Sequence, residues 1–316
     1  AIIGTGLAAI ELILESRESK GPFKNLFDFC ARLDLRKVNR RVVESLIRGG
    51  AFDTLESNRA SLLASVNLAI TAAEQGKANI AQNSLFGEEQ TQKVDMVHMD
   101  PWTPQQKLQE EKAALGFYFS GHPFTFFEKR VRPFIKTQIK ELKPQEQPYL
   151  IAGVIVAIRI RMTARGKMAI VTLDDAISRV DVVVGNELLT QSQRLVQEDQ
   201  LLIVEGRVSH DDFTGGIRVT ARKLFDLATA RNQFAHHLKI SCNGQSDAAK
   251  LRDILKPYCG VSQNNLKRCR VKIDYHNEKG HVELLLGQDW QVDLHDELID
   301  GLTQWLSEEN VKILYN

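Results

Sequence analysis

The sequence contains few cysteines, and they form none of the patterns that indicate a disulfide framework or a standard metal site. Four cysteines occur among 316 residues, and no two of them form a C-x-x-C pair. Cys259 and Cys269 lie near His276 and His281, but this spacing matches no standard zinc pattern. We therefore expect free thiols in a reducing cytosol, and hence a cytoplasmic protein.

Long apolar runs and an excess of one charge are also missing. No apolar run approaches the roughly 20 residues that a membrane-spanning helix needs. The 41 Lys and Arg residues nearly balance the 40 Asp and Glu residues, for a formal net charge of +1. Nucleic-acid binding must therefore rest on local clusters of cations. The sequence has no signal peptide and begins in the middle of a pattern, which suggests a piece of a longer protein.

Signatures of catalysis are missing as well. There is no Gly-rich phosphate loop with Lys, no nucleophile elbow and no H-E-x-x-H. The pairs Asp174-Asp175 and Asp211-Asp212 suggest a two-metal site, but both stand at strand ends or turns, where Asp is favoured for backbone reasons. Adjacent strand residues also point to opposite faces. We therefore predict no catalytic residue, no bound metal and no cofactor in this chain.

Residues 1–75 show helical periodicity. A glycine turn at Ile2–Gly6 precedes one helix, and further helices are expected over 23–34, 38–48 and 57–77. Asn39 is a suitable N-cap for the helix over 38–48, and Gly49-Gly50 would end that helix. Ser57 or Asn58 would begin the last helix.

Residues 76–103 lose this pattern, and we interpret them as a flexible connector. Leu85 and Phe86 stand side by side in it, although exposing such side chains costs about 1.5–3 kcal/mol each relative to burial. Either they fill this protein's own core, or they are held out for a partner. Together with Gln82 and Ser84 they pair a hydrogen-bonding head with two apolar anchors, as short docking peptides do.

The rest of the chain predicts three further parts. Helical spacing returns within a linker at 104–147. Residues 148–230 read as three strands, a helix over 186–197 and two more strands, the order of a five-stranded OB-fold β-barrel. Residues 231–316 alternate strands and helices in two β-α-β-like halves, with a possible short strand at Trp290–Val292, and suggest a small C-terminal α/β domain. The predicted fold class is therefore multidomain α+β.

One candidate DNA-binding surface lies in the first helical region. A glycine turn ahead of a helix presents backbone N–H groups, which makes an anion site. Cations at the start of the helix over 38–48 are unfavourable by about 0.3–1 kcal/mol each, and a bound phosphate backbone would relieve this. The alternative is a solvated basic helix end. The candidate duplex-binding residues are Gly4, Thr5, Gly6, Arg36, Lys37, Arg40 and Arg41.

A second candidate surface lies on the barrel. Arg159 and Arg161 alternate with isoleucines on the first strand and therefore share one face. In OB-folds, cations and aromatic side chains near this face and its two flanking loops bind oligonucleotides. The alternative is a barrel used only for packing. The candidate single-strand-binding residues are Arg159 and Arg161 on the first strand, Arg165 and Lys167 in the loop between the first two strands, and Phe213 and Arg218 at or beside the loop between the last two strands.

Three stretches together resemble the C-terminal part of the bacterial replicative DNA polymerase III α-subunit family. They are VNRRVVESLIRGGAFD (Val38–Asp53), EEKAALGFYFSGHPF (Glu110–Phe124) and MAIVTLDD…VDVVV…LLIVEGRV (Met168–Val208), of which LGFYFSGHP is the most specific. The resemblance is in register over residues 1–230 and extends through residue 316. One departure is Gly185-Asn186, where the family often has an aromatic residue and Pro or Ser.

The resemblance implies specific roles. IIGTG would be a helix-hairpin-helix turn holding duplex DNA, and the barrel would hold the single-stranded template. QNSLF would be the sliding-clamp peptide of the form Q-x-x-L-F, with Gln82, Leu85 and Phe86 at its key positions. The C-terminal domain would bind the τ subunit of the clamp loader. The catalytic aspartates and Mg²⁺ of the DNA-directed DNA polymerase would lie upstream, so that this piece alone is expected to be inactive.

Two alternatives stay open. One is an error-prone relative of the α subunit that acts in repair synthesis. The other is a non-enzymatic adaptor that binds single-stranded DNA. The clamp peptide and the long α/β tail favour the replicative form over the first, and LGFYFSGHP counts against the second.

Overall fold

A computed structural model of the protein describes residues 2–83, 95–164, 166–211, 215–243, 246–259 and 268–315, with the backbone alone described at 79–83. The chain divides into two compact units, Ala1–Pro123 and Phe124–Asn316. The division falls inside the segment 104–147, so the helices of this expected linker belong to different units.

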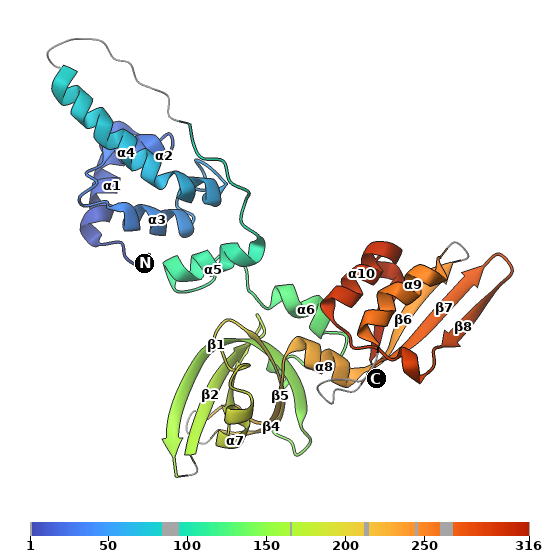
Figure 1. The fold of residues 1–316 in the computed structure, drawn as a ribbon. Coiled ribbons are helices and arrows are strands. Elements are labelled where there is room, and N and C mark those ends of the chain that lie inside the picture. Colours follow the sequence, from blue (N-terminus) through green and yellow to red (C-terminus); the bar gives the residue numbers. More distant parts are fainter. Residues whose placement is uncertain are drawn as a thin grey trace. The chain divides into compact units, whose positions relative to one another are not determined.

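The first unit is helical (Figure 1). Its helices are α1 (Leu7–Lys20), α2 (Leu26–Arg32), α3 (Arg40–Arg48), α4 (Arg59–Asn83) and α5 (Pro104–Leu115). Polar side chains begin several of them: Asn25, Asn39 and Thr103 each accept a backbone N–H bond from the first turn of the helix that follows. Such a cap contributes about 0.5–2 kcal/mol. Asn58 caps α4 in the same way, through the N–H of Ser61, as the sequence predicts.

The core of this unit is built from the apolar faces of α2, α3 and α4. Val43, Ile47 and Leu62 are almost fully buried in it. Phe29 packs edge-to-face between Phe23 and Phe52, with ring centroids 4.8 and 5.0 Å apart. Aromatic pairs of this geometry add about 0.5–1.5 kcal/mol beyond the area that they bury.

The expected connector at 76–103 is ordered at both ends, which corrects the sequence interpretation. Helix α4 continues to Asn83 because Ala, Gln and Lys, which favour helices, dominate residues 72–82. At the other end, the N–H groups of Val97 and Met99 donate to the hydroxyls of Ser65 and Ser61, 2.9 Å each. The segment that contains Val97 and Met99 therefore lies along α4.

A buried ion pair joins α4 to α5. Glu111 is fully buried and Arg59 is 5% exposed, and their charged atoms lie 3.1 Å apart. Arg59 also bonds both carboxylate oxygens of Asp53, and Glu111 accepts the N–H groups of Phe119 and Ser120 at 3.0 and 2.7 Å. One carboxylate thus fixes a neighbouring helix and the turn that follows its own helix.

The environment of Glu111 shifts its pKa. Burial alone raises the pKa of this carboxyl, but the backbone N–H bonds from Ser120 and Phe119 and the bond from Arg59 outweigh burial, and the net pKa is lowered. The hydrogen bonds that Arg59 donates to Asp53 raise its already high pKa. Both groups are therefore charged at neutral pH.

The second unit begins with α6 (Thr125–Val131), a short 3₁₀ turn η1 (Ile139–Glu141) and a closed five-stranded barrel. The strands are β1 (Tyr149–Thr163), β2 (Gly166–Asp174), β3 (Arg179–Val184), β4 (Leu201–His210) and β5 (Ile217–Phe225), and α7 (Asn186–Gln191) stands between β3 and β4. Strand order around the barrel is β1-β2-β3-β5-β4, with β3 and β5 parallel. The predicted OB-fold is confirmed, although its helix ends at Gln191, short of the expected 197.

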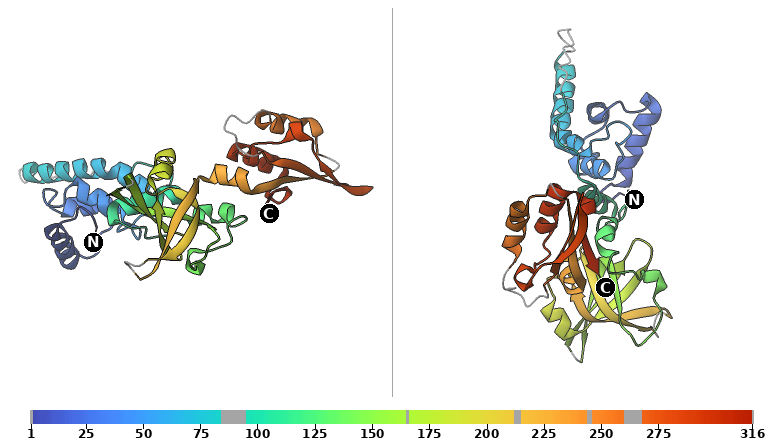
Figure 2. Two further views of the ribbon diagram at one scale, coloured as in Figure 1. Left: turned by 90° about the horizontal axis from the view of Figure 1, so that it is seen from below. Right: turned by 90° about the vertical axis from the view of Figure 1, so that its right-hand side faces the viewer.

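The C-terminal sheet contains four strands in the order β8-β7-β6-β9. These are β6 (Ala235–Asn243), β7 (Arg270–Asn277), β8 (Gly280–Leu285) and β9 (Val311–Tyr315), and α9 (Ala248–Leu255) and α10 (Asp296–Leu306) lie on one face (Figures 1 and 2). The first half is a true β-α-β unit, since β6 and β7 are parallel. The second is not, because β8 and β9 lie at opposite edges.

Two local features of this region differ from expectation. The short strand expected at Trp290–Val292 is instead a 3₁₀ turn, η3 (Gln288–Trp290), and only Val292 makes isolated bridges, to Cys259 and Cys269. Further 3₁₀ turns are η2 (Lys256–Tyr258) and η4 (Glu308–Asn310). Helix α8 (Leu227–Phe234) was not expected; the side chain of Asp226 caps it through the N–H of Thr229.

Helix α8 fastens the barrel to the C-terminal sheet. Arg231 is 4% exposed and pairs with Asp296 of α10 at 2.7 Å, and Asn232 accepts the N–H of Leu294 at 2.8 Å. The rings of Phe134 and Tyr315 lie 4.9 Å apart beside this helix, and burial raises the pKa of Tyr315 to about 12.

Replacement of Glu111 tests the importance of the buried ion pair. We expect Glu111→Gln to lower the free energy of unfolding by about 3 kcal/mol, because it leaves buried charge on Arg59 less compensated. Glu110→Gln is the control: Glu110 pairs with Arg48 at 3.2 Å while partly exposed, so its loss is expected to cost less than about 1 kcal/mol. Urea unfolding at neutral pH measures both.

The same experiment has a pH dependence. Because the folded-state pKa of Glu111 is lowered, its stabilising contribution is present above the unfolded-state value and is lost as the pH falls through the folded-state value. The difference between wild type and Glu111→Gln should therefore shrink below about pH 4.5. A difference that stays constant down to pH 3 would contradict this account.

Candidate nucleic-acid interface

The outer face of the barrel carries the predicted arginines of β1. Ile158 and Ile160 pair with Val171 and Ala169 on one face of β1, where Ile158 is half-buried and Ile160, further toward the hairpin end, is exposed. Arg159 and Arg161 therefore lie on the other, outer face. The structure thus brings these two together on one exposed face, as their alternation predicts.

Arg218 joins them from β5. It stands in register with Asp181 of β3, and Asp181 pairs with Arg159 across the outer face at 2.6 Å. Asp181 also accepts the hydroxyl of Thr172 at 2.7 Å, which fixes its rotamer. Arg218 lies 3.8 Å from Asp211. These pairs are partly exposed to solvent and contribute little to stability, so the cations can exchange carboxylates for phosphates at low cost.

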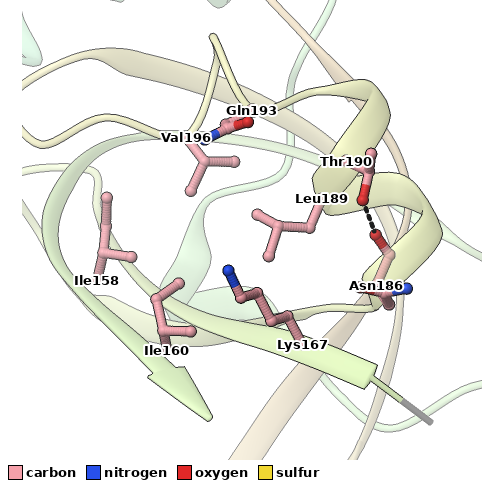
Figure 3. A pocket seen from close by; sticks show the side chains of 8 residues that line it. All are labelled: Ile158, Ile160, Lys167, Asn186, Leu189, Thr190, Gln193 and Val196. Atoms are coloured by element: carbon pink, nitrogen blue, oxygen red, sulfur yellow. Dashed lines mark hydrogen bonds between the residues drawn. The ribbon is translucent and has the colours of Figure 1, made fainter. Parts of the chain in front are cut away.

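Lys167 lies elsewhere, which corrects its expected place in the loop between the first two strands. It is the second residue of β2, pairs with Met162 and points to the same side of the β1–β2 hairpin as Ile158 and Ile160, away from the side that carries Arg161. There it enters a pocket of about 320 Å³ beside α7 (Figure 3). The pocket is lined by Ile158, Ile160, Lys167, Asn186, Leu189, Thr190, Gln193 and Val196.

The pocket combines an apolar wall with a cation and amides. Figure 3 shows the Lys167 amine directed between Ile160 and Leu189. Thr190 donates to the backbone carbonyl of Asn186 at 2.9 Å, which leaves its oxygen able to accept. An aliphatic wall with a few polar groups suits a flat or apolar group carrying an anion. The sequence did not predict this pocket, because its lining comes from β1, β2 and the segment from Asn186 to Val196, and no local pattern brings these together.

Close packing at the mouth of the β1–β2 hairpin positions Asn186. Gly166 has φ +100°, and a Cβ built on it would lie 2.8 Å from the Asn186 side chain. Only glycine fits this conformation and contact. The pocket therefore depends on Gly166, which lies next to Lys167.

Several candidate residues lie outside the described residues. These are Arg165 and Phe213 on the barrel, and Ser84, Leu85 and Phe86 of the connector peptide, while for Gln82 only the helical backbone is described.

In the first unit, Gly4 has φ +82° and the Thr5 hydroxyl donates to Ile2 at 2.7 Å, so the glycine turn is built as expected. Gly4 approaches Ser45 of α3, about one helical turn beyond Arg41. The four cations Arg36, Lys37, Arg40 and Arg41 are all exposed, and Arg40 pairs with Glu44 at 2.5 Å. The glycine turn therefore packs near α3 at Ser45, and the four cations lie just before this helix and in its first turn.

The paired aspartates of the barrel have structural roles. Asp174 accepts from Ala176 and Arg179, and Asp175 accepts the N–H groups of Ile139, Ile177 and Ser178. Both serve a turn, as inferred from the sequence. Across the described residues no group of three or more His, Cys, Asp or Glu side chains could hold a metal ion.

Family models match three parts of the chain. Residues 1–62 match a helix-hairpin-helix motif, 149–227 an OB-fold nucleic acid binding domain, and 250–306 the C-terminal domain of DNA polymerase III subunit alpha. In the described part of the chain, none of the helices is long and apolar enough to cross a membrane.

Curated proteins are similar over the whole chain. DNA polymerase III subunit alpha of Neisseria meningitidis serogroup A is 38% identical over 99% of this chain, that of Vibrio cholerae 37% and that of Escherichia coli K12 35%, each over 100%. The chain spans only 27–28% of the length of these relatives. Among solved structures, the second OB-fold domain of replication protein A from Methanococcus maripaludis is 19% identical, with 28% of this chain and 92% of that chain covered and a TM-score of 0.24.

Substitution of Gly166 tests the packing of the pocket. Gly166→Ala is expected to lower the free energy of unfolding by roughly 1–3 kcal/mol, because the new Cβ meets Asn186 and the positive φ is strained. Gly185→Ala is the matched control, since nothing lies within 4 Å of its Cβ position and its φ is −70°. Thermal unfolding compares them; equal losses would show that Asn186 does not constrain Gly166.

Proposed function

This chain belongs to the DNA polymerase III alpha family and matches its C-terminal region, and from this premise we propose that it holds DNA and recruits the sliding clamp and clamp loader for a replicative polymerase. The observation that carries the proposal is the similarity to polymerase alpha chains over the whole sequence, at 35–38% identity. The chain has no chemistry of its own in this proposal; nucleotidyl transfer and its Mg²⁺ belong to the upstream part of the parent polymerase.

The barrel binds the single-stranded template in this proposal. The match to an OB-fold nucleic acid binding domain supports it, as do the exposed cations Arg159, Arg161 and Arg218 on one outer face. Phosphates would replace the partly exposed carboxylates of Asp181 and Asp211 as partners of Arg159 and Arg218.

The first unit holds duplex DNA in this proposal. The glycine turn Gly4–Gly6 exposes N–H groups at the start of α1, where the helix dipole favours an anion. Arg36 and Lys37 lie exposed in the turn just before the neighbouring helix α3, and Arg41 lies exposed in its first turn, about one helical turn before Ser45. The match to a helix-hairpin-helix motif over 1–62 supports this assignment.

Gln82, Ser84, Leu85 and Phe86 form the clamp-binding peptide in this proposal. The pattern Q-x-x-L-F and its place at the end of α4, beyond the last core residue Ala73, support the assignment. The C-terminal domain binds the τ subunit of the clamp loader. The match of residues 250–306 to the family's C-terminal domain supports a role in the same assembly.

Arginine substitutions test the barrel. Arg159→Ala/Arg161→Ala is expected to weaken binding to oligothymidine about tenfold at low salt and to reduce the slope of log affinity against log salt by about 1.4, because each phosphate contact contributes about 0.7. Fluorescence anisotropy at several salt concentrations measures both. Arg207→Ala is the control, as an exposed arginine of β4 that pairs with Glu146. If the slope of log affinity against log salt were unchanged, the arginines would not contact phosphates, and the barrel would be used only for packing.

Clamp binding is tested separately. The full chain is expected to bind a bacterial sliding clamp with micromolar affinity, and Leu85→Ala/Phe86→Ala to abolish this, because two buried anchors carry most of the energy of such peptides. Calorimetry measures the affinity, and Val97→Ala, in the segment along α4, is the control. Equal binding by wild type and double variant would refute the clamp assignment and favour the single-strand-binding adaptor.

A further inference from the structure

The two edges of the C-terminal sheet differ in how well they are protected. Strand β9 has five residues, carries Lys312, and its pairing with β6 shifts register between Ala235 and His237. Strand β8 contains no Lys or Pro, and its register with β7 is regular throughout. Lysines, bulges and short length are the devices by which proteins block unwanted strand pairing, so β9 is blocked and β8 is open.

Strand β8 also exposes large apolar side chains. Val282, Leu284 and Leu285 are 46%, 47% and 56% exposed. Val282 and Leu284 pair in register with Tyr275 and Ile273, so they face the side that α9 and α10 cover. Those helices lie over the other strands, away from β8 (Figure 1). The apolar face of the sheet therefore continues uncovered onto its edge strand.

The hydrogen-bond register shows which backbone groups point outward. Leu286 donates its N–H to Val271 of β7 at 3.0 Å. In an antiparallel pair the bonded residues alternate, so Leu284 and Val282 also bond to β7. His281, Glu283 and Leu285 therefore direct their N–H and C=O groups away from the sheet. Within the described residues, no strand pairs with this side of β8.

The open face of the same strand is charged. Glu283 is 43% exposed and pairs with Lys272 at 2.6 Å and more loosely with Lys239 at 3.8 Å. A strand added outside β8 would place a side chain beside Glu283, and a cation there would be favourable. The edge thus selects for apolar residues on one face and a basic residue on the other.

We propose that β8 accepts an extended segment of a partner protein as an additional strand, with alternating apolar side chains against Val282 and Leu284 and a basic side chain beside Glu283. Backbone bonds would supply affinity and the alternating side chains specificity, as in other strand additions. The inference rests on the proposed function in taking this partner to be the clamp-loader τ subunit. A second copy of this chain fits less well, because antiparallel self-pairing centred on Glu283 would oppose two carboxylates.

Substitutions at Leu285 separate the backbone from the side chain. Leu285→Pro removes an outward N–H without breaking a bond to β7, and edge strands tolerate proline at such positions. Leu285→Ala is the matched control, because it removes the same side chain but keeps the N–H. We expect Leu285→Pro to weaken binding of purified τ to the full chain at least about tenfold, and Leu285→Ala only about twofold to threefold.

Two further measurements guard against misfolding and alternative occupants. Thermal unfolding of Leu285→Pro should match that of Leu285→Ala to within about two degrees, since both retain the β7 ladder. In hydrogen exchange on the wild-type chain, the amides of His281, Glu283 and Leu285 should exchange fast alone and become protected with τ bound. The amides of Val282 and Leu284 should be protected in both states.

The outcomes are distinct. If τ binds wild type and Leu285→Pro equally and the three outward amides stay unprotected, the strand-addition proposal fails while recruitment of the clamp loader stands. If τ binds neither form, the proposed partner fails and the inference fails with it. If sedimentation shows that the wild-type chain dimerises and Leu285→Pro abolishes the dimer, a second copy is the occupant and the proposal is overturned.

Discussion

The first unit depends on one carboxylate with three partners. Glu111 holds Arg59 at the start of α4 and the N–H groups of Phe119 and Ser120 in the turn after α5. A charge with no exposure requires partners in every direction, because its desolvation costs several kcal/mol. This requirement fixes α4, α5 and the turn relative to one another. The turn is part of the stretch LGFYFSGHP, so the most distinctive sequence of the chain is also the one that this carboxylate orders.

Elements with strong local periodicity could be predicted from the sequence. Alternation in β1 places Arg159 and Arg161 outside the barrel, and the caps at Asn39 and Asn58 begin the helices as expected. The same rule of alternation assigns Lys167 to the inner side once β2 is known to begin at Gly166. The sequence analysis placed Lys167 in the loop before β2, where alternation does not determine the direction of a side chain. The error was therefore in the predicted start of this strand.

Features that depend on tertiary contacts could not be predicted. Nothing local distinguishes Glu110, which is partly exposed, from Glu111, which is buried. The pocket beside α7 forms between segments far apart in the sequence. Helix α8 was not predicted, because it follows β5 after the single residue Asp226, whose side chain caps it, and because the burial of Ala230 and Arg231 that stabilises it depends on tertiary contacts.

Contacts made by α8 join the barrel and the C-terminal sheet within one compact unit. Arg231, Asn232 and the rings around Tyr315 are buried polar and aromatic contacts that a sliding interface would have to break together. A nucleic acid on the outer barrel face and a protein on the β8 edge would therefore bind to the same compact unit.

The connector is attached to α4 at Asn83 and again at Val97, which limits how far the peptide between these points can extend. Ser65, which holds Val97, lies 18 residues before the end of α4 at Asn83, a helical distance of about 27 Å. The 14 peptide steps from Asn83 to Val97 span at most about 48 Å when fully extended. About 27 Å of this length is needed to return along the helix to Ser65. The remainder, divided between the outward and the return path, allows the chain to extend only about 10 Å beyond the end of α4. In the proposed function, a clamp bound to this peptide would therefore have to lie close to the end of α4.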